Sequence, residues 1–183
     1  MKQIRMKHLR PLFCLLLLSN VLVAQGPKQE KMEQLHFLVG EWVGTSKIYE
    51  NGVLAKEGAA YEHISYDLEK NILVIELNTE FLQLHTVILY DEKDQKYYYH
   101  RFSKDGAAVY PAEFKEELIV WRDENTRFFF GSTPEGRFRE YGEQLINGKW
   151  VKTFEDTFIN TQWKSKSKNP KVQLQVQKWK ASI

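Results

Sequence analysis

The sequence has almost no cysteine and little net charge, and both absences exclude classes of protein. Cys14 is the single cysteine among 183 residues, and it lies in an apolar N-terminal segment. If that segment is removed, no thiol remains, so we expect no disulfide, no thiolate metal site and no cysteine nucleophile. The formal net charge is only +2, which gives no support for nucleic-acid binding.

The usual catalytic signatures are also missing from the sequence. Gly-x-Ser-x-Gly, the phosphate-binding P-loop and the dinucleotide fingerprint do not occur. The histidines that follow the N-terminal segment are His36, His63, His85 and His100, and no two of them are two, three or four residues apart. The sequence therefore predicts no local metal site, although ligands from separate strands could still meet.

The first 24 residues have the pattern of a secretory signal peptide. Residues 1–10 carry four basic side chains and no acid, residues 12–23 are almost wholly apolar, and Ala24 is a small residue suited to cleavage. An apolar stretch of about 12 residues is shorter than the roughly 20 that a membrane-spanning helix needs. We therefore expect cleavage after Ala24 and an exported protein, periplasmic or extracellular, with an uncleaved anchor as the alternative.

Removal of residues 1–24 changes the charge balance. It leaves 22 basic and 24 acidic side chains, a net charge of −2, so most of the basic character belongs to the signal. Residues 164–183 hold six lysines and no acid. Lys164, Lys166 and Lys168 could contact an anionic surface such as lipid headgroups. The alternative is that Lys164 to Lys171 form a solvated loop. In that case the lysines near the last strand keep its edge from pairing with other molecules.

A change of hydrophobic period divides the rest of the chain. Met32, Leu35, His36 and Val39 recur at helical spacing, so a short helix is expected within residues 25–40. Beyond Gly40 the period is two, with tight turns such as Asn51-Gly52 between the apolar runs. The expected strands are 42–50, 53–66, 72–79, 82–90, 96–102, 107–114, 118–122, 126–131, 137–146, 150–159 and 172–176.

These ten or eleven strands predict an all-β fold. No second helix long enough for a parallel crossover is present, so neighbouring strands should pair as an antiparallel meander. A meander of this size avoids exposed edges by closing into an up-and-down barrel. We expect one domain, residues 25–183, with a two-sheet sandwich as the alternative. Pro111 predicts an edge or a bulge in its strand.

The segment Phe37-Leu38-Val39-Gly40-Glu41-Trp42-Val43-Gly44 resembles the opening of calycin-type barrels. In lipocalins and nitrobindin-like barrels a short helix leads into a Gly-x-Trp on the first strand, and small secreted bacterial proteins of unassigned role open similarly. The resemblance implies that Gly40 turns the chain into the sheet and that Trp42 plugs the closed end. It also implies that a basic residue of the last strand, Lys178 here, lies across the Trp42 ring.

The resemblance does not extend to haem. Nitrobindin-like haem barrels ligate iron through a histidine late in the chain, whereas His100 is the last histidine here. We therefore expect no haem bound in that mode and no other cofactor.

Two groups of arginine and tyrosine are candidate ligand-binding residues. Their members alternate along a strand, so each group shares one face, and an inward Arg–Tyr pair would clamp a carboxylate or phosphate. Fatty-acid-binding proteins use a similar Arg-x-Tyr on the last strand, whereas another hairpin follows it here. The alternative is that Arg137 and Arg139 face solvent while Phe138 points inward. The two groups are Arg137, Arg139 and Tyr141, and Tyr97, Tyr99 and Arg101.

Glu76 and His85 lie in the two most apolar strands. If both point inward, they could form a hydrogen-bonded pair and carry out acid–base chemistry. A buried polar pair without a catalytic role is the alternative.

These observations leave three functions open. The first is a secreted, lipocalin-like protein that binds a small apolar or amphipathic molecule in its barrel. The second is an enzyme on the same barrel that uses Glu76 and His85. The third is a surface-interaction protein, for which the C-terminal lysines are the only indication.

Overall fold

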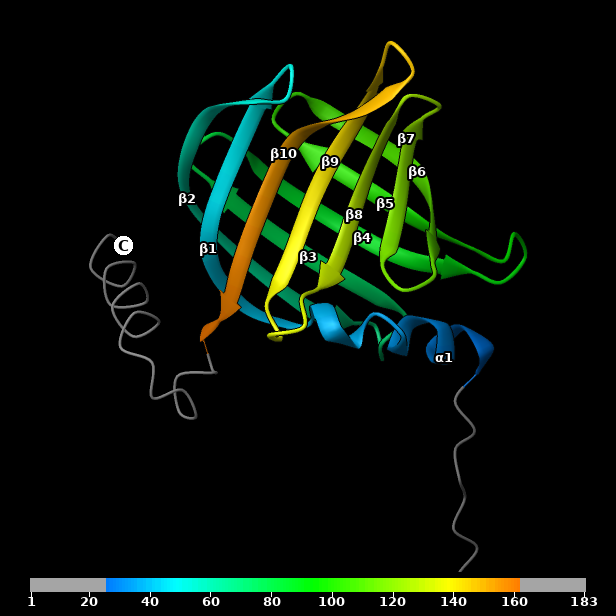
Figure 1. Ribbon diagram of the computed structural model, residues 1–183. Coiled ribbons are helices and arrows are strands. Elements are labelled where there is room, and N and C mark those ends of the chain that lie inside the picture. Colours follow the sequence, from blue (N-terminus) through cyan, green and yellow to red (C-terminus); the bar gives the residue numbers. More distant parts are fainter. Residues whose placement is uncertain (1–25, 162–183) are drawn as a thin grey trace, which may run out of the picture.

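The computed structural model describes residues 26–161, which form a closed barrel of ten antiparallel strands with a short helix at one end (Figure 1). The all-β barrel predicted from the sequence is confirmed, and the two-sheet sandwich is wrong. The elements are α1 (Pro27–Glu33), a 3-10 turn η1 (His36–Leu38), β1 (Gly40–Glu50), β2 (Val53–Asp67), β3 (Ile72–Thr79), β4 (Gln83–Asp91), β5 (Lys96–Ser103), β6 (Gly106–Phe114), β7 (Leu118–Asp123), β8 (Thr126–Ser132), β9 (Phe138–Ile146) and β10 (Lys149–Asn160).

Each strand pairs with its neighbours in sequence, and β1 pairs with β10 to close the barrel. The closing register joins Trp42 to Asn160 and Ile48 to Phe154. The Asn51-Gly52 turn between β1 and β2 has φ values of 52° and 79°. Positive φ values at both turn residues match the right-handed twist of the two strands that such a hairpin joins.

The helical segment covers one end of the barrel. The side chain of Gln29 donates to the Glu69 carbonyl in the β2–β3 turn at 3.2 Å. Tyr66 and Tyr97 donate their hydroxyls to the carbonyls of Met32 and Lys31. These bonds hold α1 against the β2–β3 and β4–β5 turns, so this end is closed.

The helix predicted within residues 25–40 is present but interrupted. It ends at Glu33 and continues as a 3-10 turn after Leu35. The interruption rotates the apolar face, so Leu38 is fully buried while the side chain of His36 is exposed. His36 therefore does not share the buried side of this segment with Leu35 and Leu38.

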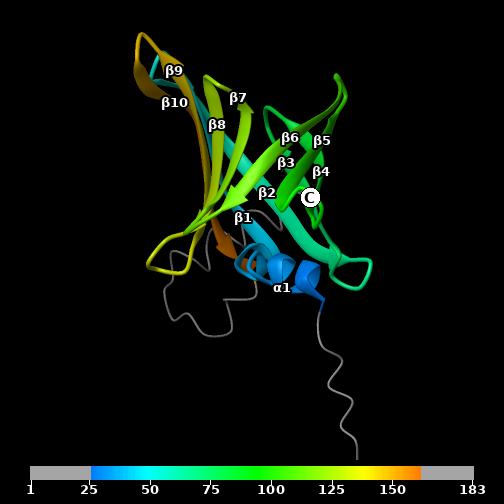
Figure 2. The ribbon, with the colours of Figure 1, turned by 90° about the vertical axis from the view of Figure 1, so that its right-hand side faces the viewer.

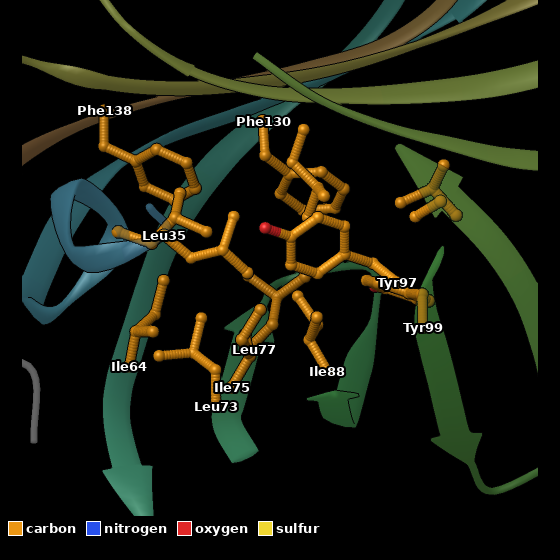
Figure 3. Close-up of a cluster of buried hydrophobic side chains, with 14 of the residues drawn as sticks. Leu35, Ile64, Leu73, Ile75, Leu77, Ile88, Tyr97, Tyr99, Phe130 and Phe138 are labelled. Carbon is orange, nitrogen blue, oxygen red and sulfur yellow. The ribbon is translucent and has the colours of Figure 1, made fainter. Parts of the chain in front are cut away.

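The half of the barrel next to the helix is filled by side chains. Figure 3 shows Ile64, Leu73 and Ile88 converging from three strands on Leu35 of the helical segment. Rings from β5, β8 and β9 complete this cluster. Burial of these apolar groups stabilises the fold without a disulfide.

Trp42 and Gly40 lie at the end of the barrel that the helical segment covers. The Trp42 ring is buried, its Nε1 donates to the Leu38 carbonyl at 2.7 Å, and its centroid lies 5.4 Å from that of Phe138. Gly40 has a φ of 153°, and a Cβ there would clash with the side-chain amide of Asn160. This position therefore requires glycine.

The wall of the barrel is incomplete between β6 and β7. Only three residue pairs join these strands, from Ala112–Val120 to Phe114–Leu118. Beyond them β6 pairs with β5 alone, and Figure 2 shows β6 and β7 diverging toward the open end. Pro111, which has no N–H, lies where the pairing stops, so the predicted edge is present.

Several predictions lie outside the described residues. These are the signal peptide at 1–24, the strand at 172–176, the lysines Lys164, Lys166 and Lys168, and Lys178. Within residues 26–161, no helix has the length and apolar character needed to cross a membrane.

Candidate functional site

A cavity of about 420 Å³ occupies the open half of the barrel, above the packed core. Its walls come from the inward faces of the strands, because side chains alternate between the two faces of a sheet. The lining is Ser46, Ile48, Leu77, Thr79, Leu82, Leu84, Tyr99, Arg101, Tyr110, Arg122, Thr126, Phe128, Phe130, Glu140, Gln144, Thr153, Phe154 and Asp156.

One wall of the cavity carries a row of polar side chains across three strands. Ser46 of β1 is in register with Asp156 of β10, which is in register with Glu140 of β9. The Asp156 carboxyl makes side-chain hydrogen bonds with Ser46 and Glu140.

A third carboxyl, that of Glu62 on β2, belongs to the same cluster. The charge of Glu62 raises the pKa of Glu140, and the charge of Asp156 raises the pKa of Glu62. The exposed fractions of Glu62, Glu140 and Asp156 are 1%, 4% and 3%. We call these three residues the carboxyl cluster.

Burial is the main influence on all three carboxyl groups, because a charge is poorly solvated inside the barrel. It raises the pKa of Glu62 and of Glu140 well above the ordinary range, and the neighbouring carboxyls raise both further. Burial also raises the pKa of Asp156, although its hydrogen bonds with Ser46 and Glu140 oppose the rise.

The carboxyl cluster is not neutralised by the protein. In the described part of the chain none of its three members forms an ion pair with a basic side chain. Within the same residues, Glu62 Oε2 and Asp156 Oδ1 are buried without a hydrogen-bond partner. Buried polar atoms are normally paired, so the cluster has unused capacity to bind a donor.

Aromatic rings form a continuous row along the cavity. Tyr99 lies 5.6 Å from Phe130 and 6.5 Å from Tyr110, measured between ring centroids. Phe128 lies 6.5 Å from Tyr110 and 5.8 Å from Phe154. The Tyr99 hydroxyl accepts a hydrogen bond from Thr86 at 3.2 Å, and burial raises its pKa. These rings offer both apolar surface and π-faces to a ligand.

The candidate residues of β5 lie on the inner face. Tyr99 and Arg101 line the cavity, and Arg101 Nη1 donates to Ser103 near the open end at 3.3 Å. Tyr97 lies deeper, with its hydroxyl bound to Lys31 and Gln34 at the closed end. The three residues share one face, as their spacing predicts, but Tyr97 is not part of the cavity lining.

The other predicted group lies outside the cavity. Phe138 points into the core with an exposed fraction of 1%, which agrees with the alternative stated for this strand. Arg139 lies over the Tyr141 ring at 4.5 Å and 3.9 Å from the Glu155 carboxylate. Arg137 is exposed. None of Arg137, Arg139 and Tyr141 lines the cavity.

Glu76 and His85 meet, but on the outer face. They are in register between β3 and β4, with His85 Nε2 3.9 Å from Glu76 Oε1. His63 of β2 lies on the other side, 3.8 Å from Glu76 Oε2. All three side chains are substantially exposed, so the predicted inward pair is not formed. Within residues 26–161, no group of three or more His, Asp or Glu side chains is placed to hold a metal ion.

Sequence reasoning missed the carboxyl cluster, although a signal for it was present. Glu140 lies between Phe138 and Gly142, and Asp156 lies between Phe154 and Phe158. Two apolar or small residues at i−2 and i+2 indicate that the acid between them shares a buried face.

Comparisons with known proteins add little to this description. No protein-family model and no curated protein matches the chain. A solved structure of a protein of unknown function from the DUF3598 family of Nostoc punctiforme is similar at 8% identity, over 71% of this chain and 98% of that one. Its TM-score is 0.25.

Proposed function

We propose that this protein is an exported, lipocalin-like barrel of the calycin type that binds a small molecule inside its cavity. The observation that supports this most directly is the void of about 420 Å³ in the open half of a closed barrel. That volume is in the range of small-molecule sites, which combine apolar walls with a few polar groups. The aromatic row and the carboxyl cluster provide this combination.

Filling the cavity tests the proposal. Leu84 lines the cavity on β4, whereas Val87 on the same strand points outward. Leu84→Trp should weaken binding of the uncharged dye N-phenyl-1-naphthylamine at least tenfold, because the added ring occupies the site. Val87→Trp should leave the affinity unchanged. Equal affinity of wild type and Leu84→Trp, or no dye binding by wild type, would count against the cavity as the site.

An enzyme is the second candidate, and the row His63–Glu76–His85 favours it. Glu76 is flanked by both histidines at 3.8 and 3.9 Å and lines a surface hollow with Asn78 and Gln83. A carboxylate beside an imidazole can assist proton transfer. The exposed position provides little exclusion of water, however, so cavity binding is the better supported function. The surface role of the C-terminal lysines stays a prediction.

A further inference from the structure

The carboxyl cluster and the aromatic row restrict what the cavity can bind. We propose that its ligand is an amine, whose ammonium group lies against Glu140 and Asp156 and whose apolar body lies along Phe128 and Tyr110. The inference rests on the proposed function and adds the chemical class of the ligand.

The polarity of the inner wall supports a cationic group. Asp156 Oδ1 is buried without a partner in the described chain, and Asp156 lines the cavity. An ammonium group can donate three hydrogen bonds, and bonds between charged partners are the strongest. It would therefore satisfy this oxygen and supply the positive charge that the cluster lacks.

The aromatic row supports the same ligand class. The rings of Tyr99, Tyr110 and Phe128 border the cavity next to the carboxyl wall. Aromatic faces attract ammonium groups, and this attraction is greatest where water is excluded. An anionic ligand would meet both the negative faces of the rings and the carboxyl cluster, which disfavours it at this depth.

Charged and titratable side chains from several strands surround the site of the cluster. They are Glu62 from β2, Tyr99 and Arg101 from β5, Tyr110 from β6, Arg122 from β7, Glu140 from β9 and Asp156 from β10, with Glu155 adjacent on the outer face. Arg101 and Arg122 lie toward the open end, and Arg122 is exposed. Neither forms an ion pair within residues 26–161 that would neutralise the cluster.

Binding of an ammonium group should be coupled to proton release. Burial raises the pKa of both Glu140 and Asp156, which favours bound protons on these carboxyls before a cation arrives. An incoming cation favours the ionised carboxyls, so protons leave as it binds. The affinity should therefore rise with pH through the carboxyl transitions and fall again only where the amine itself loses its proton.

Three probes with the same aromatic body separate the alternatives: 1-naphthylmethylamine, 1-naphthalenemethanol and 1-naphthoate. Isothermal titration at pH 7.5 in two buffers of different ionisation enthalpy gives both affinity and protons released. We expect the amine to bind at least tenfold more tightly than the alcohol, with net proton release, and the naphthoate to bind most weakly.

Two isosteric variants locate the effect. Asp156→Asn and Glu140→Gln should reduce the preference for amine over alcohol to about threefold or less. An unchanged far-UV circular dichroism spectrum shows that the barrel is intact in each variant. Glu155→Gln, the neighbour on the outer face of the same strand, should leave the preference unchanged.

The possible results are distinguishable. If the alcohol or the naphthoate binds as tightly as the amine, the ligand class is wrong while the binding function stands. If amine preference survives both isosteric variants, the cluster is not its cause and the inference is overturned. If none of the three probes binds, the inference also fails, and dye binding to the Leu84→Trp and Val87→Trp pair decides the proposed function separately.

Discussion

Glu140 and Asp156 lie side by side on β9 and β10, in register, with their carboxyl groups hydrogen-bonded to each other inside the barrel. Two adjacent buried acids without a basic partner in the described chain are costly to ionise. A protein that only needed a stable core would have apolar residues at both positions. The pair therefore lowers the stability of the barrel wherever both carboxyls are ionised.

The stability of the protein should fall as the pH rises above the ordinary carboxyl range. The folded-state pKa values of Glu62 and Glu140 are raised by burial, so the folded state binds more protons than the unfolded state between the ordinary and the raised pKa. The free energy of unfolding consequently decreases with pH in this window. Urea unfolding between pH 4 and pH 8 measures it.

Glu62→Gln should flatten this pH dependence and raise the free energy of unfolding at pH 8 by about 1–3 kcal/mol, because no buried charge has to form. The exposed Glu50→Gln is the matched control and should leave the profile unchanged. A Glu62→Gln profile as steep as that of wild type would show that Glu62 does not titrate in this window.

Trp42→Phe should destabilise the closed end. The variant keeps an aromatic ring against Phe138 but loses the buried hydrogen bond from Trp42 Nε1 to the Leu38 carbonyl. We expect a loss of about 1–3 kcal/mol, the cost of leaving that carbonyl unpaired and of removing part of the ring. Chemical denaturation measures the loss, and Trp121→Phe on the outer face should cost clearly less.

The outer face holds a cation–aromatic cluster that should matter for stability and not for binding. The Arg127 guanidinium lies 3.9 Å from the Trp150 ring centroid, and its Nε and Nη2 both donate to Glu143 Oε2. Arg127→Lys keeps the charge but loses the planar stacking, so we expect a loss of about 0.5–1.5 kcal/mol. Unchanged dye affinity would agree with its position outside the cavity, and lost affinity would not.

Glu76→Gln tests whether the ligand binds in the barrel interior or at the outer hollow. Because Glu76 lies on the outer face between His63 and His85, the substitution should leave dye and amine affinity within twofold of wild type. A large loss of affinity, measured by titration, would place the binding site at the outer hollow instead of the barrel interior.

The strands and turns were predictable because they depend on local chemistry. Asn147-Gly148 adopts φ values of 50° and 75°, as a two-residue hairpin requires, and period-two alternation marks most of the strands. The sequence does not show which face of β9 points inward, because both faces carry polar residues. Glu140 shares the face of Phe138, and Arg139 lies on the opposite face. Only the assembled barrel shows that Phe138 and Glu140 point inward.

The carboxyl cluster could not be assembled from the sequence because its members come from three separate strands. Glu62, Glu140 and Asp156 meet through barrel closure, which depends on the pairing of β1 with β10. Local pattern shows only that each acid shares a face with apolar neighbours. The same limit applies to Glu76 and His85, which meet as neighbours in register but on the outer face. Their strands are apolar on both faces, so the sequence does not show which face points inward.

Native mass spectrometry of the full chain, purified from its own host, tests the central claim most directly. If the cavity holds a ligand, wild type should carry a small molecule that dissociates on activation, and Leu84→Trp prepared in parallel should carry none. A wild-type spectrum showing only the bare polypeptide, or the same adduct on Leu84→Trp, would contradict a ligand held inside the barrel.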